Sequence, residues 1–356
     1  MHVIFLVHGM GSSTPGWSKR AQDILRKHYK PEKYAFLADF AFDAHFAFEE
    51  INYNNIFDRY LVEAGKQADK LGRWSKLVDP ANQVLNGLLG RVVAAASTPP
   101  SKGFLVTHIA DVAFFMATDL GEHVKSAVAS QIAARLAKGK FDPAKDSWSV
   151  IAHSLGTRVM TETLQVGFSA APGFLSVGKA RVLLMAANVS RLLQEIVPPV
   201  FNAGDVYRNL VYPSNGPLGV CRHFINATHR LDPFAFIKEF DPPATFGDGN
   251  ALADGLDHPV KLATSDITDK DVHALEHYLE HPAVHSTLFR YLLPGTGRKQ
   301  ATRQEMEQAM AEYHQATLAA QVTNAWRARL QALKDEQFQK LEEVLGIWEK
   351  YGDLLA

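Results

Sequence analysis

Short apolar runs recur along the chain and are separated by stretches in which apolar residues return every three or four positions. A short run without polar alternation is typical of a strand that is covered on both faces. We expect strands at Val3–Val7, Tyr34–Phe42, Trp148–Ile151, Ala180–Met185 and Arg222–Asn226. Strands that alternate with helical patterns predict an α/β fold, with a mostly parallel central sheet flanked by helices.

The helical patterns are clearest at three places. Trp17–Tyr29 reads as a helix, and Gly121–Lys138 carries apolar residues at spacings of four. Residues 301–350 contain no proline and almost no glycine, and their apolar positions step by three or four. This segment predicts one long helix or two, packed against the rest of the chain or against a second subunit. We therefore expect a domain over 1–295 and a C-terminal helical extension over 296–356.

Residues 50–120 are too long for a simple connection between two elements. They contain two apolar stretches, Val84–Ala96 and Phe104–Thr118, with a proline-containing segment between them. Arg91 interrupts the first stretch and Asp111 the second, so neither reaches the roughly 18 uncharged residues of a membrane span. We expect a helical insertion here. Two interpretations stay open: a lid over an apolar cleft, and a buried helical pair in an enlarged core.

Five phenylalanines near the second predicted strand fall on even positions, namely Phe36, Phe40, Phe42, Phe46 and Phe48. Side chains two residues apart on a strand share a face, so this spacing predicts one aromatic face that continues past the strand end. The face belongs either to the core or to the wall of an acyl-binding pocket.

The composition narrows the classes of function. The 356 residues carry a formal net charge of -1, and no basic block marks a site for nucleic acid or another polyanion. The single cysteine, Cys221, excludes an intrachain disulfide, so stability needs no oxidising compartment. The first residues read as a strand without a basic leader. We therefore expect a cytoplasmic protein, unless a signal-independent route exports it.

The most specific motif runs from a buried strand through Ala152–Gly156 (AHSLG) into a helical pattern. A strand, a sharp turn that carries a serine, and a helix form the nucleophile elbow of α/β-hydrolases. The turn crowds two backbones, so the residues that flank Ser154 must be small. Gly156 meets that need, and Ala152 stands where glycine is usual. The alternative is that Ser154 is an ordinary helix N-cap after a strand.

A second glycine-containing turn, His8–Ser13 (HGMGSS), follows the first strand. Gly9 and Gly11 let the backbone turn sharply and leave amide N–H groups free to face a ligand. The turn lacks both GxGxxG and a terminal Gly-Lys-Ser/Thr, so a phosphate-binding loop fits poorly. An ordinary strand-to-helix turn is the alternative. We expect His8 to shape the loop rather than to ionise in catalysis.

Together with the RLDP segment at 230–233 and the region around His273, these motifs resemble the lipase/esterase type of α/β-hydrolase. The resemblance covers residues 1–293 apart from the insertion. It implies that Ser154 is the nucleophile and that the backbone N–H groups of Met10 and Leu155 bind the oxyanion, with Gly9 and Gly11 shaping that loop.

The acid and the base follow the nucleophile in this family. Asp232 precedes a proline and an apolar residue, as in the acid loop of lipases. Asp241, also before proline, is the alternative, and an Asx-turn is the non-catalytic interpretation of both. The spacing of a histidine, four residues, a tyrosine, three residues and a proline resembles the base region of serine esterases and selects His273. His277 stays open as the alternative base.

Four histidines in residues 271–285 also raise the question of a metal site, because they lie four residues apart. On one continuous helix they would share a face and, with Glu276 and Glu280, suggest zinc. Pro282 argues against this, since it breaks a helix directly after His281. We therefore expect neither a metal nor an organic cofactor.

The sequence thus predicts a serine hydrolase that cleaves carboxylic esters through an acyl-serine intermediate. The apolar insertion and the aromatic face favour a lipid-like or otherwise hydrophobic acyl group. Two alternatives are a phospholipase effector that acts at a membrane surface and a catalytically silent scaffold that binds a partner. The expected partners are a small-molecule or lipid ester and, through the C-terminal helices, a second copy of the chain.

Overall fold

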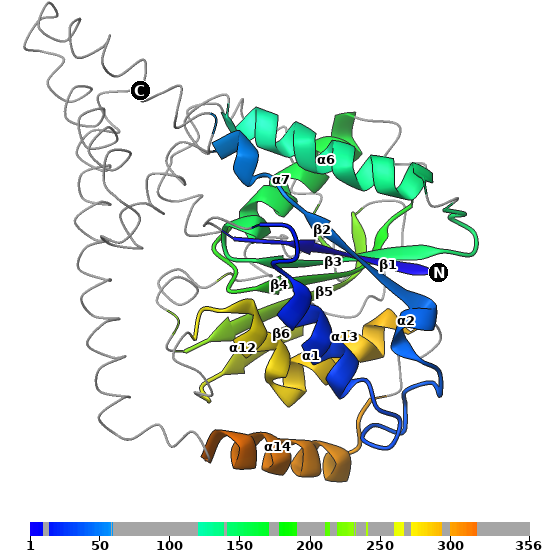
Figure 1. Ribbon diagram of the computed structural model, residues 1–356, viewed down its shortest axis with the longest axis vertical. Coiled ribbons are helices and arrows are strands. Elements are labelled where there is room, and N and C mark those ends of the chain that lie inside the picture. The colour runs from blue at the N-terminus through cyan, green and yellow to red at the C-terminus, as the bar shows by residue number, and fades with distance from the viewer. Residues whose placement is uncertain are drawn as a thin grey trace, which may run out of the picture.

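The computed structural model describes residues 1–9, 14–57, 59, 120–138, 141–170, 178–190, 211–213, 219–230, 232, 240, 260–266, 272–293 and 300–318. Within these residues, one all-parallel sheet has the strand order β2-β1-β3-β4-β5-β6 (Figure 1). Its strands are β1 (His2–Val7), β2 (Phe46–Ile51), β3 (Ser147–His153), β4 (Ala180–Ala186), β5 (Cys221–His229) and β6 (Val260–Thr264).

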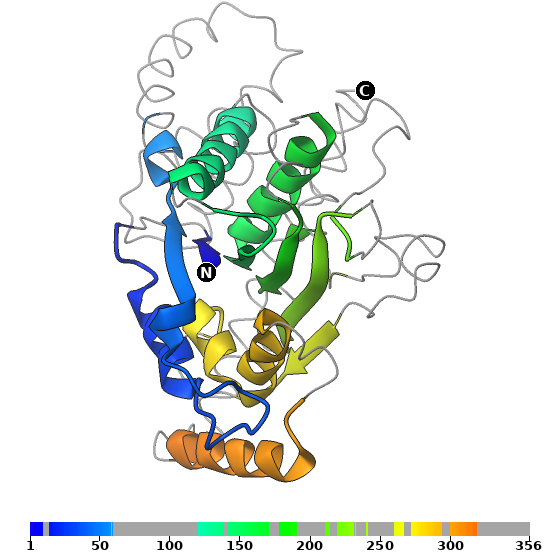
Figure 2. The same cartoon turned by 90° about the vertical axis from the view of Figure 1, so that its right-hand side faces the viewer.

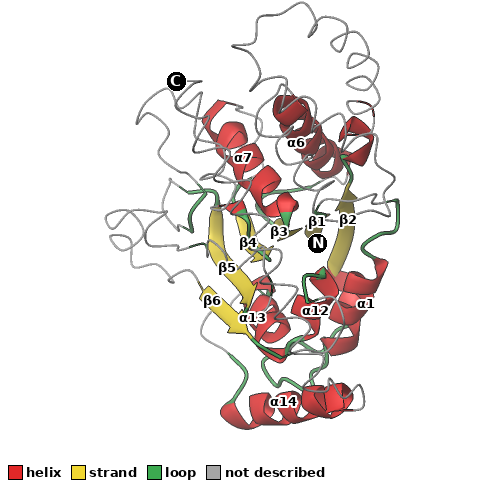
Figure 3. Cartoon of the chain, turned by 90° about the vertical axis from the view of Figure 1, so that its left-hand side faces the viewer, coloured by secondary structure: helices red, strands yellow, loops and turns green. Residues whose placement is uncertain are grey.

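Helices cover both faces of this sheet, which makes the chain an α/β protein (Figures 1 and 3). On one face lie α6 (Leu120–Lys138) and α7 (Leu155–Ala170), which pack against each other. On the other face lie α1 (Lys19–His28), α12 (Leu275–Glu280) and α13 (Pro282–Leu292), and α2 (Phe42–His45) leads directly into β2. A further helix, α14 (Arg303–Leu318), packs on α13 outside this layer (Figure 2). The prediction of a parallel sheet flanked by helices is therefore confirmed.

The two faces of the sheet explain why its central strands read as uninterrupted apolar runs. In β1, Val3, Phe5 and Val7 belong to the core on the α6 and α7 side. Ile4 and Leu6 of the same strand belong to the core on the α1 and α13 side. Successive side chains point to opposite faces of a strand, so a strand that is covered on both faces buries apolar side chains at successive positions.

Most elements lie close to their predicted positions. The strands expected at Val3–Val7, Trp148–Ile151, Ala180–Met185 and Arg222–Asn226 are present and extend by one to three residues at one or both ends. The helix predicted at Gly121–Lys138 begins one residue earlier. The first helix begins at Lys19 rather than Trp17. The break that Pro282 predicts is also present, because α12 ends at Glu280 and α13 begins at Pro282.

The predicted strand at Tyr34–Phe42 is wrong. The segment forms turns that lead into α2, and the strand lies farther along, at β2. The apolar positions reflect burial of single aromatic side chains: Tyr34 is fully buried, and Phe42 packs against Tyr29 and Phe46 with ring centroids 5.3 and 4.6 Å apart. These aromatic residues belong to the core, and the partly buried Phe36, Phe40 and Phe48 pack against it. Of the two interpretations of the aromatic face, the structure therefore supports a core face.

The edge strand β6 is an element that the sequence analysis missed. It has five residues, and its burial alternates between exposed and covered positions, with Lys261 facing solvent. Such a short strand lacks the continuous apolar run that identifies the central strands, although its pairing with β5 completes the sheet.

Several predicted features lie outside the described residues. They are Met10, Gly11, Asp241, the apolar stretches 84–96 and 104–118, and the predicted helical region beyond 318. Among the helices that are described, none combines the length and the apolar character that crossing a bilayer requires.

Candidate active site

The predicted nucleophile, acid and base all follow carboxyl ends of strands. Ser154 comes directly after β3, Asp232 shortly after β5, and His273 in the segment after β6. Parallel strands end at the same edge of a sheet, so these three segments meet there. The chain passes from β1 outward to β2 and then back across to β3. Open α/β sheets bind ligands at such a reversal of strand order, outside the carboxyl ends of the two strands.

Ser154 has an unusual backbone conformation. Its φ of 53° is positive, which it shares with only Ala187 among the described non-glycine residues. This conformation costs about 1–3 kcal/mol and persists only when neighbours hold it. The Ser154 N–H donates to the carbonyl of Ala186 (3.0 Å), and the Ser154 carbonyl accepts from both N–H and Oγ1 of Thr157 (2.9 and 2.6 Å). An ordinary N-cap lies in the β region instead, so the turn at Ser154 is more strained than an ordinary helix start.

Two glycines make the tight turn possible. A Cβ on Gly156 would lie 2.7 Å from the Val7 carbonyl oxygen and still closer to that of His8. A Cβ on Gly9 would lie 2.7 Å from the Cβ of Ser154. The start of α7 and the end of β1 thus approach so closely that a side chain at either glycine would collide with them.

Ser154, His273 and Asp232 form a continuous hydrogen-bonded chain. The Ser154 hydroxyl donates to Nε2 of His273 at 2.9 Å, and Nδ1 of His273 donates to Oδ2 of Asp232 at 2.8 Å. Asp232 is fully buried, and the side chain of His273 is 13% exposed. An ionised carboxylate only accepts hydrogen bonds, so it fixes the proton of His273 on Nδ1 and leaves Nε2 as the acceptor for the serine.

The alternative base has a different environment. His277 lies in α12, is 4% exposed, and meets the ring of His229 edge-on at 5.0 Å. The structure therefore brings His273, and not His277, to Ser154.

Two further side chains contact this chain of residues, and the sequence analysis missed both. His153, which precedes the nucleophile, donates from Nε2 to the backbone carbonyl of His273 at 2.5 Å. Burial and the nearby His273 lower the pKa of His153 to about 3, so it is neutral at physiological pH. Tyr278 donates its hydroxyl to Oδ2 of Asp232 at 2.6 Å. His153 lies within the AHSLG motif and Tyr278 within the spacing that selects His273, but no local pattern indicates either contact.

The described start of the loop after β1, His8 and Gly9, is held in place by local contacts and by Tyr53. Tyr53 stacks on the ring of His8 at 4.2 Å and donates its hydroxyl to the His8 carbonyl. Nδ1 of His8 donates to the carbonyl of Gly9 at 2.5 Å. Burial lowers the pKa of His8 to about 4. These contacts agree with a role of His8 in shaping the loop.

Leu155 is the first residue of α7. The N–H groups in the first turn of a helix have no acceptor within that helix and carry a partial positive charge. The Leu155 N–H is therefore suited to bind a negative oxygen beside Ser154.

Among the described residues, no group of three or more histidine, cysteine, aspartate or glutamate side chains is arranged to hold a metal ion. Comparisons with protein-family models, curated proteins and solved structures found no match to this chain. Any functional conclusion therefore depends on the chemistry of the site itself.

Proposed function

We propose that this protein is a serine hydrolase that cleaves carboxylic esters through an acyl-serine intermediate. One observation carries the proposal: Ser154, in a strained turn between a strand and a helix, donates to His273, which in turn donates to the buried Asp232. A serine hydroxyl is a weak nucleophile until a base removes its proton, and a carboxylate stabilises the imidazolium that results. The three side chains have the geometry for these roles.

In the proposed reaction, Nε2 of His273 takes the hydroxyl proton while Oγ of Ser154 bonds to the ester carbonyl carbon. The carbonyl π electrons move onto the oxygen and return as the bond to the leaving alcohol breaks. His273 gives its proton to that alcohol. Water then repeats the sequence on the acyl-serine, with His273 as the base, and releases the carboxylic acid and free Ser154.

The oxyanion is stabilised by backbone N–H groups in this proposal. Leu155 supplies one from the start of α7, and Met10 is the proposed second donor. Each such donor contributes on the order of 3 kcal/mol to the transition state, because it is already oriented before charge develops.

The assignment to the α/β-hydrolases is part of the proposal. It is supported by a nucleophile after β3, an acid after β5 and a base after β6, in one parallel sheet. The proposed architecture adds a helical insertion at about 50–120 and a C-terminal helical extension at 296–356.

A hydrophobic acyl group is the proposed substrate preference. The aromatic face around Phe42 and Phe46 belongs to the core, so it no longer supports this preference. The support comes from the apolar composition of 84–96 and 104–118. Hydrolysis rates over p-nitrophenyl esters of increasing chain length test it, and a maximum at acetate would contradict it.

Labelling with a fluorophosphonate probe tests the catalytic assignment. We expect the wild type to be labelled, Ser154→Ala to be unlabelled, and Ser286→Ala to be labelled as the wild type is. Ser286 is a suitable control because it is equally buried but lies in α13. An unlabelled wild type, or equal labelling of Ser154→Ala, would contradict the proposal.

A further inference from the structure

Tyr278 contacts the carboxylate of Asp232 directly. Its hydroxyl lies 2.6 Å from Oδ2 of Asp232, and its side chain is fully buried. The same oxygen accepts from Nδ1 of His273 at 2.8 Å. We propose that Tyr278 is a positioning residue that sets how strongly His273 holds a proton, by sharing the carboxylate oxygen that pairs with it. This inference rests on the proposed hydrolase function.

The direction of the hydrogen bond follows from its partners. An ionised carboxylate has no proton to give, so the phenol must donate. Hydrogen bonds to a charged acceptor stabilise the charged form and reduce its affinity for protons. Electron density that Oδ2 gives to Tyr278 is not available to His273. The imidazolium therefore gains less from Asp232 than it would from a carboxylate without the tyrosine.

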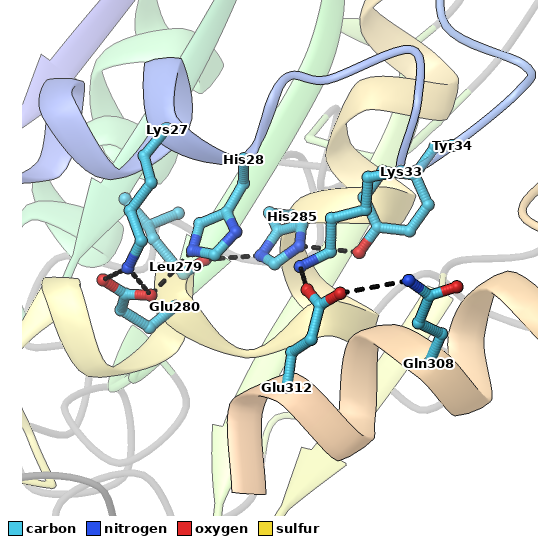
Figure 4. A network of polar contacts seen from close by, with 9 residues as sticks. All are labelled: Lys27, His28, Lys33, Tyr34, Leu279, Glu280, His285, Gln308 and Glu312. Atoms are coloured by element: carbon cyan, nitrogen blue, oxygen red, sulfur yellow. Dashed lines mark hydrogen bonds and ion pairs between the residues drawn. The ribbon is translucent and has the colours of Figure 1, made fainter. Parts of the chain in front are cut away.

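The short helix α12 fixes the place of the phenol. Tyr278 follows His273 by five residues, so the base and the second donor to Asp232 arrive on one continuous segment. The far end of α12 is tied down separately, as Figure 4 shows: the Leu279 carbonyl accepts from His285 at 2.9 Å, and Glu280 binds His28 at 2.7 Å and Lys27 at 3.0 Å. The position of Tyr278 is therefore set by the fold as well as by its bond to Asp232.

Burial keeps three other described histidines in this part of the protein neutral, so they do not change the proton affinity of His273 by their charge. Burial lowers the pKa of His153 to about 3 and that of His8 to about 4. Burial also lowers the pKa of His229, whose Nε2 donates to the Asp266 carbonyl. The Asp266 carboxylate faces other histidines. These three imidazoles carry no charge at neutral pH, so they neither repel nor stabilise a proton on His273.

The test is the pH dependence of kcat/KM for a p-nitrophenyl ester in Tyr278→Phe. Removal of the hydroxyl takes one donor away from Oδ2, so the hydrogen bond that His273 donates to Oδ2 strengthens and His273 holds its proton to a higher pH. His273 feels only part of the loss of this charge-assisted hydrogen bond, so we expect the acid limb to move up by about 0.5–1 pH unit. Tyr34→Phe is the matched control. Its fully buried hydroxyl also contacts a histidine, His285 at 2.8 Å, and its loss leaves the acid limb in place.

A purely structural role of Tyr278 would lower thermal stability and leave the acid limb unmoved, which would overturn the inference. Site-specific replacement of Tyr278 by 3-fluorotyrosine provides a second variant. Its phenol is a stronger hydrogen-bond donor to Asp232, so the acid limb of the pH profile must move to lower pH. The pH dependence of the fluorophosphonate labelling rate separates the two proposals. A wild type that is not labelled contradicts both, whereas labelling at Ser154 with an unmoved limb contradicts the role of Tyr278 alone.

Discussion

Two histidines in this protein each lie between a hydroxyl group and an oxygen acceptor, but in very different settings. His273 accepts from Ser154 and donates to Asp232. His285 accepts from Tyr34 at 2.8 Å and donates to the Leu279 carbonyl at 2.9 Å, in the network of Figure 4. The hydrogen-bond pattern alone does not separate them, so other properties must make one a candidate base and the other part of the core.

Charge and strain are the properties that differ. The acceptor of His273 is a carboxylate, which stabilises an imidazolium, whereas the acceptor of His285 is a neutral carbonyl. Burial, and the neighbouring His28 whose ring stacks on it at 4.2 Å, hold the pKa of His285 well below its usual value. Burial also raises the pKa of Tyr34, so its hydroxyl keeps its proton. The hydroxyl partner of His273 is Ser154, whose strained backbone lies at the carboxyl end of β3. His285, in contrast, is fully buried.

The largest expected difference is in catalysis. We expect His273→Ala to lower kcat for ester hydrolysis by about 10⁴–10⁶-fold with a small change in stability, because it removes the proposed base from a proposed set of three side chains that act together. His285→Ala removes the partner of Tyr34 and of Leu279 and leaves a cavity, so it should lower the free energy of unfolding by about 2–4 kcal/mol.

The kcat of His285→Ala should stay within about threefold of the wild-type value. The contacts of Glu280 with His28 and Lys27 still hold α12 against α1 in this variant. Steady-state kinetics and urea denaturation on both variants make the comparison. Equal losses of kcat would erase the distinction between the two histidines.

The pH dependence of stability sharpens the comparison for His285. Its folded-state pKa lies below the unfolded value of 6.5, so the unfolded chain takes up a proton that the folded chain excludes. The stability is therefore present above pH 6.5 and is lost as the pH falls, by about 1.4 kcal/mol per pH unit.

Urea denaturation at pH 7, 6 and 5 should show a slope that is shallower in His285→Phe than in the wild type by this amount, because the other buried histidines contribute equally to both proteins. Parallel slopes would mean that His285 is protonated in the folded protein.

The smallest expected effect concerns the strain at Ser154. Glycine adopts a φ of 53° without a steric penalty, so we expect Ser154→Gly to raise the free energy of unfolding by about 1 kcal/mol while abolishing hydrolysis. Ser154→Ala keeps the strain and serves as the matched control. If both variants have the same melting temperature, the turn stores no strain.

The sequence predicted those elements whose local pattern and tertiary role agree. The strands β1, β3, β4 and β5 are covered on both faces, so each contains a short, mostly apolar run. Helix α6 buries one regular stripe, so its apolar residues recur at spacings of four. The strand predicted at Tyr34–Phe42 is absent because this segment forms turns. Aromatic side chains that project from these turns into the core have a spacing that resembles the alternation of a strand. The strand β6 was missed because an edge strand of five residues needs little apolar sequence.

The residues of the candidate site also fall into two groups: those that a local motif predicts and those that no local pattern indicates. Ser154, Asp232 and His273 each lie beside a local motif, and their order along the chain could be compared with that of a family. The contacts of His153 and Tyr278 join residues 120 and 46 positions apart. Such contacts depend on how separate segments dock, which the period and composition of a single segment do not record.

The place of β1 in the sheet has a consequence for how the chain acquires its structure over time. The strand lies between β2 and β3, and its pairing with β3 joins His2 to Ser147. During synthesis on the ribosome, β1 therefore cannot pair with β3 until well over a hundred further residues have been made. Contacts of such long sequence separation form slowly and leave strand edges open to aggregation in the meantime.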